Sequence, residues 1–136
     1  MTSWNERNKG VIEEFRATGG KVKGWGSLIL LTTTGAKTGQ PRIIPLMRVD
    51  DGNRLIAVAS KGGAPKHPDW YLNLLAHPEV TVEVGDDKFT TTARVLTGEE
   101  RERAFKRAIE VFPNYDKYQK NTAREIPVIA LERPTK

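Results

Sequence analysis

The chain has 136 residues, of which 38% are hydrophobic and 29% are charged, as is typical of a globular domain that can bury a core. It contains no cysteine and only two histidines, which excludes disulfides, cysteine nucleophiles and a histidine-rich metal site. No apolar run approaches the roughly 20 residues of a membrane span, and the N-terminus has no signal-peptide core. We therefore expect one cytoplasmic domain over residues 1–136, without a metal site.

The formal net charge is +5, and most of the excess positive charge lies in one segment. Between residues 35 and 67 there are six Lys or Arg residues and two acidic residues. Such a segment suits an acidic small molecule, nucleic acid or an anionic membrane surface. Because these cations fall in turns, without aromatic residues regularly interleaved along strands, we expect no nucleic-acid partner.

Residues 1–24 are predicted to form a helical arm, and the remaining residues, 25–136, a barrel with its covering helices. The residues of the arm that recur at helical spacing are Trp4, Asn8, Val11, Ile12 and Phe15. The helix should end at residues 18–20, Thr-Gly-Gly. We expect it to pack on the barrel; the alternative is a contact with an anionic membrane surface, which Glu13 and Glu14 disfavour.

Six strands are predicted from apolar or alternating runs. Their expected ranges are 28–33, 42–49, 54–60, 79–84, 88–96 and 126–131. Residues 50–53 have the composition of a hairpin turn. Pro41 and Pro45 indicate that the second strand has an edge or irregular portion, because proline cannot donate to a sheet. Since strands and helices do not alternate, we expect a mainly β, α+β fold with mostly antiparallel strands.

Two more helices are predicted. The first covers residues 68–76, where Pro68 suits the first turn and Asp69 the positive end of the helix dipole. The second runs from Thr97, as N-cap, to Phe112, with Glu100 completing a capping box. Residues 114–119, which follow, are predicted as a short segment bearing two tyrosines.

Residues 32–42, TTTGAKTGQPR, form the first basic loop, between the first two predicted strands. Hydroxyls, exposed amides and two cations, Lys37 and Arg42, would converge there on an anion. The loop superficially resembles a P-loop, but the Walker spacing is missing and a strand follows it. The second basic loop, residues 60–67 (SKGGAPKH), follows the third predicted strand. We expect both loops to hold one multiply anionic small molecule.

The sequence contains no evident catalytic constellation. Its carboxylates form no distinctive pair, and GxGxxG and GxSxG motifs are absent. Four aromatic residues could offer faces to a planar ring, with core packing or a surface turn as the alternatives: Trp70, Tyr71, Tyr115 and Tyr118. His67 is either a contact to the anion or an ordinary loop residue. A planar ring with an anionic tail describes a flavin-like redox cofactor, which would itself carry the difficult chemistry.

The sequence resembles the deazaflavin-dependent nitroreductase family, actinobacterial split β-barrel proteins that use coenzyme F420. The likeness covers nearly the whole chain. The segments that carry it are 30–42, 44–46, 58–68, 70–71, 73–74, 77–80 and 126–128, and the stretch from residue 60 to residue 74 is the most specific. The resemblance implies a split β-barrel and a deazaflavin with a phosphate and an oligoglutamate tail. The carboxylates of that tail would account for the clustered cations.

The resemblance also implies the cofactor site. Lys37, Thr38 and Arg42 would line the groove for the tail and the phosphate. The residues expected against the phosphate and the ring are Ser60, Lys61, Gly63 and Ala64. The remaining members of the cofactor site are Trp70 and Asn73, with Pro45 beside it. Many relatives have Arg or Lys where this chain has Ala36, so one tail contact is expected to be missing.

The substrate pocket implied by the resemblance lies over the cofactor ring. Tyr115 and Tyr118 would wall it. Some members that activate nitroimidazole prodrugs carry one tyrosine near the position of Met47 and another near that of Phe112. Both positions are apolar in this chain, which argues against that substrate.

The reaction implied is hydride transfer from the reduced deazaflavin to a planar acceptor such as a quinone, a nitroaromatic or an enone. A proton would follow from solvent or from a hydroxyl, with Ser60 and Tyr118 as the candidate catalytic residues. A lipophilic quinone such as menaquinone would suit a protein that touches the inner face of the membrane through its N-terminal helix. The alternatives are an FMN-binding split-barrel oxidoreductase and a non-catalytic deazaflavin carrier.

Overall fold

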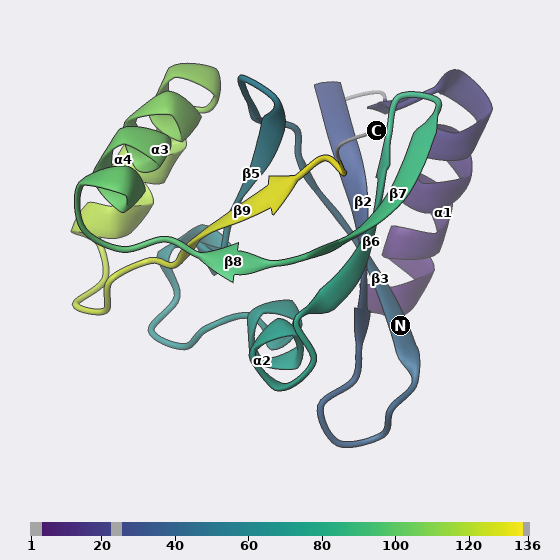
Figure 1. Cartoon of the computed structure of the whole chain (residues 1–136), viewed down its shortest axis with the longest axis horizontal. Coiled ribbons are helices and arrows are strands. Elements are labelled where there is room, and N and C mark those ends of the chain that lie inside the picture. The colour runs from purple at the N-terminus through teal and green to yellow at the C-terminus, as the bar shows by residue number, and fades with distance from the viewer. Residues whose placement is uncertain (1–3, 23–25, 135–136) are drawn as a thin grey trace.

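The computed structural model describes residues 4–22 and 26–134 (Figure 1). Its strands are β1 (Lys21–Val22), β2 (Gly26–Thr34), β3 (Pro41–Met47), β4 (Asp50–Asp51), β5 (Arg54–Val58), β6 (Glu79–Val84), β7 (Asp87–Thr92), β8 (Arg94–Val95) and β9 (Val128–Glu132). Its helices are α1 (Trp4–Thr18), α2 (Asp69–Ala76), α3 (Gly98–Val111), α4 (Asn114–Lys120) and the short 3₁₀ helix η1 (Lys61–Gly63). Each of the six predicted strands appears, with the one over residues 88–96 divided into β7 and β8, and the short β1 and β4 are additional. Residues 50–51, predicted as part of a hairpin turn, form β4.

The strands form two sheets in which every pairing within the described ranges is antiparallel. The first sheet holds β1, β2, β3, β6 and β7, and the second has the order β4-β5-β9-β8. Only Ala93 separates β7 from β8, and only Arg48 and Val49 separate β3 from β4. Two bent strands therefore run from one sheet into the other, around an incomplete ring (Figure 1). The expected α+β fold of mostly antiparallel strands with covering helices is confirmed.

Alternation along the strands divides the apolar residues among three cores, because successive side chains point to opposite faces. In β2, Ile29 and Leu31 enter the central core with residues of both sheets, whereas Leu28 and Leu30 enter a core that contains Phe15 of α1. In β5, Leu55 and Ala57 face the central core, and Ile56 and Val58 face a third core under α3 and α4. Helix α1 and the α3–α4 pair thus cover opposite sides of the molecule (Figure 1).

Helix α1 ends as predicted, with Gly20 N donating to Phe15 O at 3.0 Å. Phe15 is 2% exposed, and Val11 and Ile12 pack partly against the same core, so the helix packs on the sheet. The side chains of Trp4 and Asn8 lie outside the described part of the structure. Among the described residues, no helix has both the length and the apolar character needed to cross a membrane.

The prediction for β3 is confirmed. Pro45 lies opposite Leu30 and Pro41 opposite Thr34, and within the described ranges β3 pairs with β2 alone in its sheet. Its other edge carries no ladder, so the missing N–H groups of the two prolines cost no strand pairing there.

Two predictions about the C-terminal helices are wrong. Thr97 occupies the N-cap of α3, but its side chain makes no capping hydrogen bond. The Glu100 carboxylate instead accepts hydrogen bonds from Arg94 and Arg54, which are stronger donors than a backbone amide. Residues 114–120 form the helix α4, so the described chain has four α-helices rather than three.

Candidate functional site

The first basic loop joins β2 to β3 and is held by hydrogen bonds of its own. Gly35 N donates to Gln40 O at 2.8 Å, and Gly39 N donates to Gly35 O at 2.9 Å. Thr38 Oγ1 accepts a hydrogen bond from Gln40 N at 3.2 Å, so this hydroxyl oxygen is used inside the loop. Lys37 is exposed at the turn of the loop.

Asn73 of α2 fastens the first basic loop to that helix. Its Oδ1 accepts a hydrogen bond from Ala36 N at 3.0 Å, and its Nδ2 donates to Thr33 Oγ1 at 3.3 Å. Asn73 was predicted to bind the cofactor. In the structure its amide is engaged by the loop, and this engagement positions the cations of the loop.

The second basic loop follows β5 and contains η1. Ser60 is 8% exposed, and its hydroxyl makes no hydrogen bond within the described part of the chain. Gly63 has φ +82°, and a Cβ at this position would lie 3.0 Å from Tyr118 O and 3.2 Å from Tyr118 Cα. The loop therefore packs directly on the backbone of α4, which carries the predicted pocket tyrosines.

A residue that no sequence pattern indicated, Arg124, lies behind this loop. Its guanidinium donates to the carbonyl oxygens of Ala59, Ser60 and Ala64 at 3.2, 2.8 and 2.9 Å. It also lies 3.0 Å from His67 Nδ1, which must act as the acceptor because arginine only donates. Burial, and then the charge of Arg124, lower the pKa of His67 and favour its neutral form. His67 is therefore part of the support of the loop.

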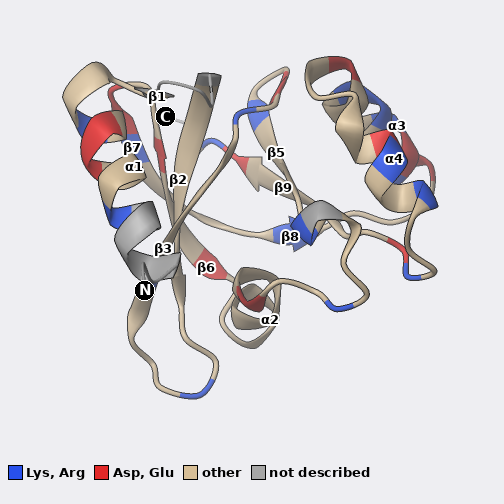
Figure 2. Ribbon diagram, turned by 180° about the vertical axis from the view of Figure 1, so that it is seen from behind, with Lys and Arg blue, Asp and Glu red and all other residues tan. Residues whose placement is uncertain are grey.

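The cations of the two basic loops lack acidic partners. Arg48 pairs with Asp50 and Arg54 with Asp51, each at 3.0 Å. The other four cations between residues 35 and 67 form no ion pair with any carboxylate of the described residues: Lys37, Arg42, Lys61 and Lys66. Figure 2 shows Lys and Arg segments in both loops, which lie to either side of α2. A bound polyanion would relieve the mutual repulsion of these cations.

The residues of the predicted substrate pocket are brought together around the third core. The ring of Phe112 lies 5.0 Å from that of Tyr115 and 6.1 Å from that of Tyr118, and Met47 packs against the same core. Tyr115 is only 6% exposed, and burial, with a smaller contribution from Tyr118, raises the pKa of its hydroxyl. Tyr118 is half-buried, so it has more ring surface than Tyr115 to offer an acceptor.

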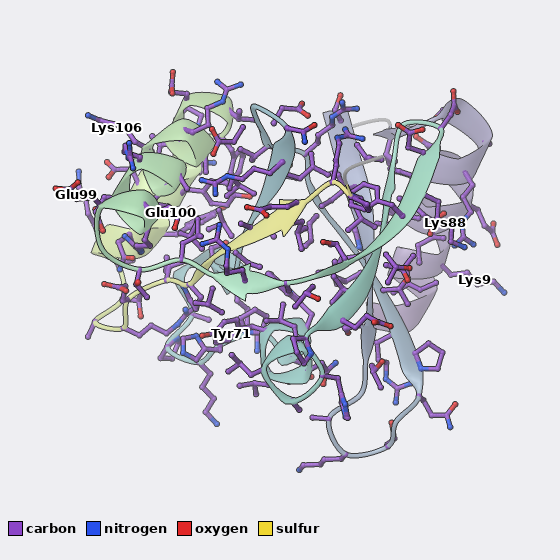
Figure 3. All side chains as sticks on the ribbon, viewed as in Figure 1. Lys9, Tyr71, Lys88, Glu99, Glu100 and Lys106 are labelled. Atoms are coloured by element: carbon purple, nitrogen blue, oxygen red, sulfur yellow. The ribbon has the colours of Figure 1, made fainter. Side chains whose placement is uncertain are left out.

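Two residues predicted to contact the cofactor are largely enclosed. Trp70 is 8% exposed and packs in the central core, and Pro45 is buried in β3. They have little surface for a ligand. Tyr71 of α2, labelled in Figure 3, has its ring centroid 4.9 Å from that of His67 in the second basic loop.

Two hollows in the described part of the molecule lie away from these residues. The smaller is lined by Asp51, Arg54, Glu100 and Arg103. The larger, of about 730 Å³, lies between α3 and α4 and includes Arg101, Lys106 and Arg124. Neither contains a residue predicted for the cofactor or the substrate, although Arg124 borders both the larger hollow and the second basic loop.

Comparisons with known proteins agree on one cofactor. The family model described as F420H(2)-dependent quinone reductase matches residues 5–133. An F420H(2)-dependent quinone reductase of Mycobacterium tuberculosis (strain ATCC 25618 / H37Rv) is 38% identical over 98% of both chains.

Two solved structures are similar to this chain, and the description of one names the same cofactor. A structure of an F420-H2 dependent reductase, FDR-A, has a TM-score of 0.73 and 52% identity, over 77% of this chain and 93% of its own. A second, described as a domain-swapped dimer, has a TM-score of 0.75 and 43% identity, over 96% of this chain and 100% of its own.

Proposed function

The chain belongs to the F420H(2)-dependent quinone reductase family, and from that premise we propose that its two basic loops hold coenzyme F420 beside a quinone-type acceptor. As a member of this family it is an F420-dependent oxidoreductase. When bound, the reduced cofactor supplies a hydride to a planar acceptor. The narrower assignment, to the deazaflavin-dependent nitroreductases with their split barrel, belongs to the same proposal. It is supported by the two bent strands, β3–β4 and β7–β8, that run from one sheet into the other.

The observation that carries the assignment of the site is the set of four cations without carboxylate partners among the described residues. The first basic loop, which contains Lys37 and Arg42, lies on one side of α2, and the second, which contains Lys61 and Lys66, lies on the other (Figure 2). A cofactor with a phosphate and several tail carboxylates fits such a pair of loops, because each cation gains a charge-assisted hydrogen bond. We assign the tail to the first basic loop and the phosphate to the second.

The acceptor is assigned to the surface formed by Met47, Phe112 and Tyr118. A half-buried cluster of apolar and aromatic side chains suits the flat ring of a quinone, including a lipophilic one such as menaquinone. The hydroxyl of Ser60 has no hydrogen-bond partner in the described structure, so it is free to donate to a reacting oxygen. Tyr118 lies on the helix that packs against the same loop.

Binding is tested by titrating the protein with coenzyme F420 and following the quenching of tryptophan fluorescence. We expect saturable quenching, and about tenfold weaker binding in Lys37→Ala and in Lys61→Ala, since a hydrogen bond to a charged group contributes roughly 1.5–3 kcal/mol. Only the Lys37→Ala loss should grow with the length of the glutamate tail. Lys106→Ala, on the exposed face of α3, is the matched control (Figure 3). Tighter binding of flavin mononucleotide, or unchanged affinity in both loop variants, would contradict the proposal.

Turnover with a menaquinone analogue tests the acceptor surface. If the Tyr118 hydroxyl supplies the proton, Tyr118→Phe should lower kcat by about a hundredfold or more, the usual contribution of one acid–base group, without changing F420 affinity. Equal kcat values in the variant and the wild-type protein would remove Tyr118 from this role.

A membrane contact through α1 is a separate part of the proposal. The apolar side chains of α1 that the structure describes face the core, so only the polar face that carries Lys9 is left to meet anionic headgroups. Co-sedimentation with anionic vesicles that is unaffected by Lys9→Glu would argue against this contact.

A further inference from the structure

We propose that Arg124 is the positioning residue of the second basic loop, which it fixes in the conformation that holds the phosphate of the cofactor. This inference rests on the proposed function of that loop. It adds a residue that lies outside both basic loops and outside the acceptor surface.

The contacts of Arg124 span most of the loop. Nη2 donates to Ser60 O at 2.8 Å, Nε to Ala64 O at 2.9 Å, and Nη1 to Ala59 O at 3.2 Å. The same Nη1 reaches His67 Nδ1 at 3.0 Å. One side chain thus connects the end of β5, the start of η1, the residue after η1 and the end of the loop.

The chemistry of this contact requires arginine. Its guanidinium presents five N–H donors in a rigid planar fork, whereas lysine presents three donors at a single point. The guanidinium fork can reach all the acceptors spread over residues 59–67, whereas an ammonium can reach only some of them. A lysine at position 124 would keep the charge but lose most of this set of hydrogen bonds, which we call the clamp.

The clamp is itself anchored on α4. Gln119 Nε2 donates to Arg124 O at 2.9 Å, and Gln119 Oε1 accepts a hydrogen bond from Ile126 N at 2.9 Å. Gly63 packs on the Tyr118 backbone of the same helix. The loop is therefore attached to α4 at two points, by Arg124 and by Gly63.

Arg124 also adds charge to the loop. It forms no ion pair with a carboxylate of the described residues, and neutral His67 does not cancel its charge. The loop thus has a fixed positive charge behind it in addition to Lys61 and Lys66. The fixed conformation of the loop and the positive charge around it both favour binding of a phosphate.

The clamp is tested first without cofactor, by amide hydrogen exchange in Arg124→Lys and Arg124→Gln. We expect exchange over residues 59–67 to rise by about tenfold or more in both, because a lost hydrogen bond to a charged group allows local opening. Arg107→Lys and Arg107→Gln are the matched controls, since Arg107 donates to one distant backbone oxygen, that of Asp50. Unchanged exchange over residues 59–67 in both Arg124 variants would overturn the proposal.

The second measurement compares two ligands, coenzyme F420 and the phosphate-free 8-hydroxy-5-deazariboflavin. In both Arg124 variants, F420 should bind about tenfold more weakly or worse, while affinity for the phosphate-free ligand stays within about twofold. Equal losses for both ligands would overturn the positioning role, because general damage would not discriminate between them. The lysine variant keeps this test available if the glutamine variant folds poorly. A wild-type protein that binds neither ligand would refute the proposed function, and the exchange experiment would still report on the clamp.

Discussion

At the scale of single residues, Gly63 connects the second basic loop with α4. Its φ of +82° is unfavourable for any side chain, and the backbone of Tyr118 occupies the space that a Cβ would need. Gly39, in the other basic loop, also has a positive φ, +70°, but nothing lies within 4 Å of its missing Cβ. Substitution of Gly39 therefore tests backbone strain alone, and substitution of Gly63 tests backbone strain together with a steric clash.

We expect Gly39→Ala to cost only the left-handed conformation, roughly 1–2 kcal/mol in the free energy of unfolding. Gly63→Ala should cost about 1–3 kcal/mol more, because the obstructing atoms belong to backbone that is held in a helix. Urea unfolding of the two variants measures the difference. Equal losses would show that η1 and α4 separate without penalty.

Residue identity in the site was predictable from the sequence only in part. The glycines and lysines of the two basic loops could be predicted to bind an anion, because their residue types and their positions in turns indicate it. Arg124 does not, because its acceptors are backbone carbonyls and one imidazole that lie 57 to 65 residues away along the chain. Asn73 was predicted to bind the cofactor, and in the structure its amide contacts the first basic loop.

At the scale of elements, Glu100 joins α3 to two strands. Its carboxylate accepts hydrogen bonds from Arg94 of β8 and from Arg54 of β5. These bonds, the one from Arg94 first, lower the pKa of Glu100 from its usual 4.5 to about 2. Thr97 and Glu100 matched a capping box in sequence, and tertiary partners displaced that local interaction.

A lowered carboxyl pKa stabilises the fold above the pKa of the unfolded chain, and this stability is lost as the pH falls toward the folded pKa. Glu100→Gln should therefore lower the melting temperature at pH 7, and the difference from wild type should shrink between about pH 4.5 and pH 2. Glu99→Gln is the matched control, because its exposed side chain forms no ion pair with a described residue (Figure 3). A Glu100→Gln deficit that is constant with pH would contradict this account.

At the scale of the whole molecule, the fold was predictable because its strands are marked by alternation and its turns by glycine, proline and aspartate. What the sequence did not indicate is that the strand predicted over residues 88–96 bends at Ala93 from one sheet into the other, or that β3 is followed by β4 in the second sheet. A bend of this kind leaves no periodic pattern in the sequence, because it depends on which distant strands pair with each half of the bent strand.

The distribution of charge over the molecule predicts a strong effect of salt on cofactor binding. Raising the ionic strength from about 0.05 to about 0.5 M shortens the screening length roughly threefold and should weaken F420 binding to the wild-type protein. Lys37→Ala should show a shallower dependence, since it has one cation fewer to screen. Isothermal titration at several salt concentrations measures both slopes, and parallel slopes would place the tail elsewhere.

The position of β9 has a consequence for synthesis of the protein on the ribosome. β9 lies between β5 and β8 in the second sheet, and its residues Val128, Ile129, Ala130 and Leu131 are all buried. Residues 54–58 must therefore wait for the synthesis of about seventy more residues before they gain this partner. Until then the nascent chain exposes the apolar, aggregation-prone edge of β5. Completion of β9 is therefore the step at which a chaperone would matter most.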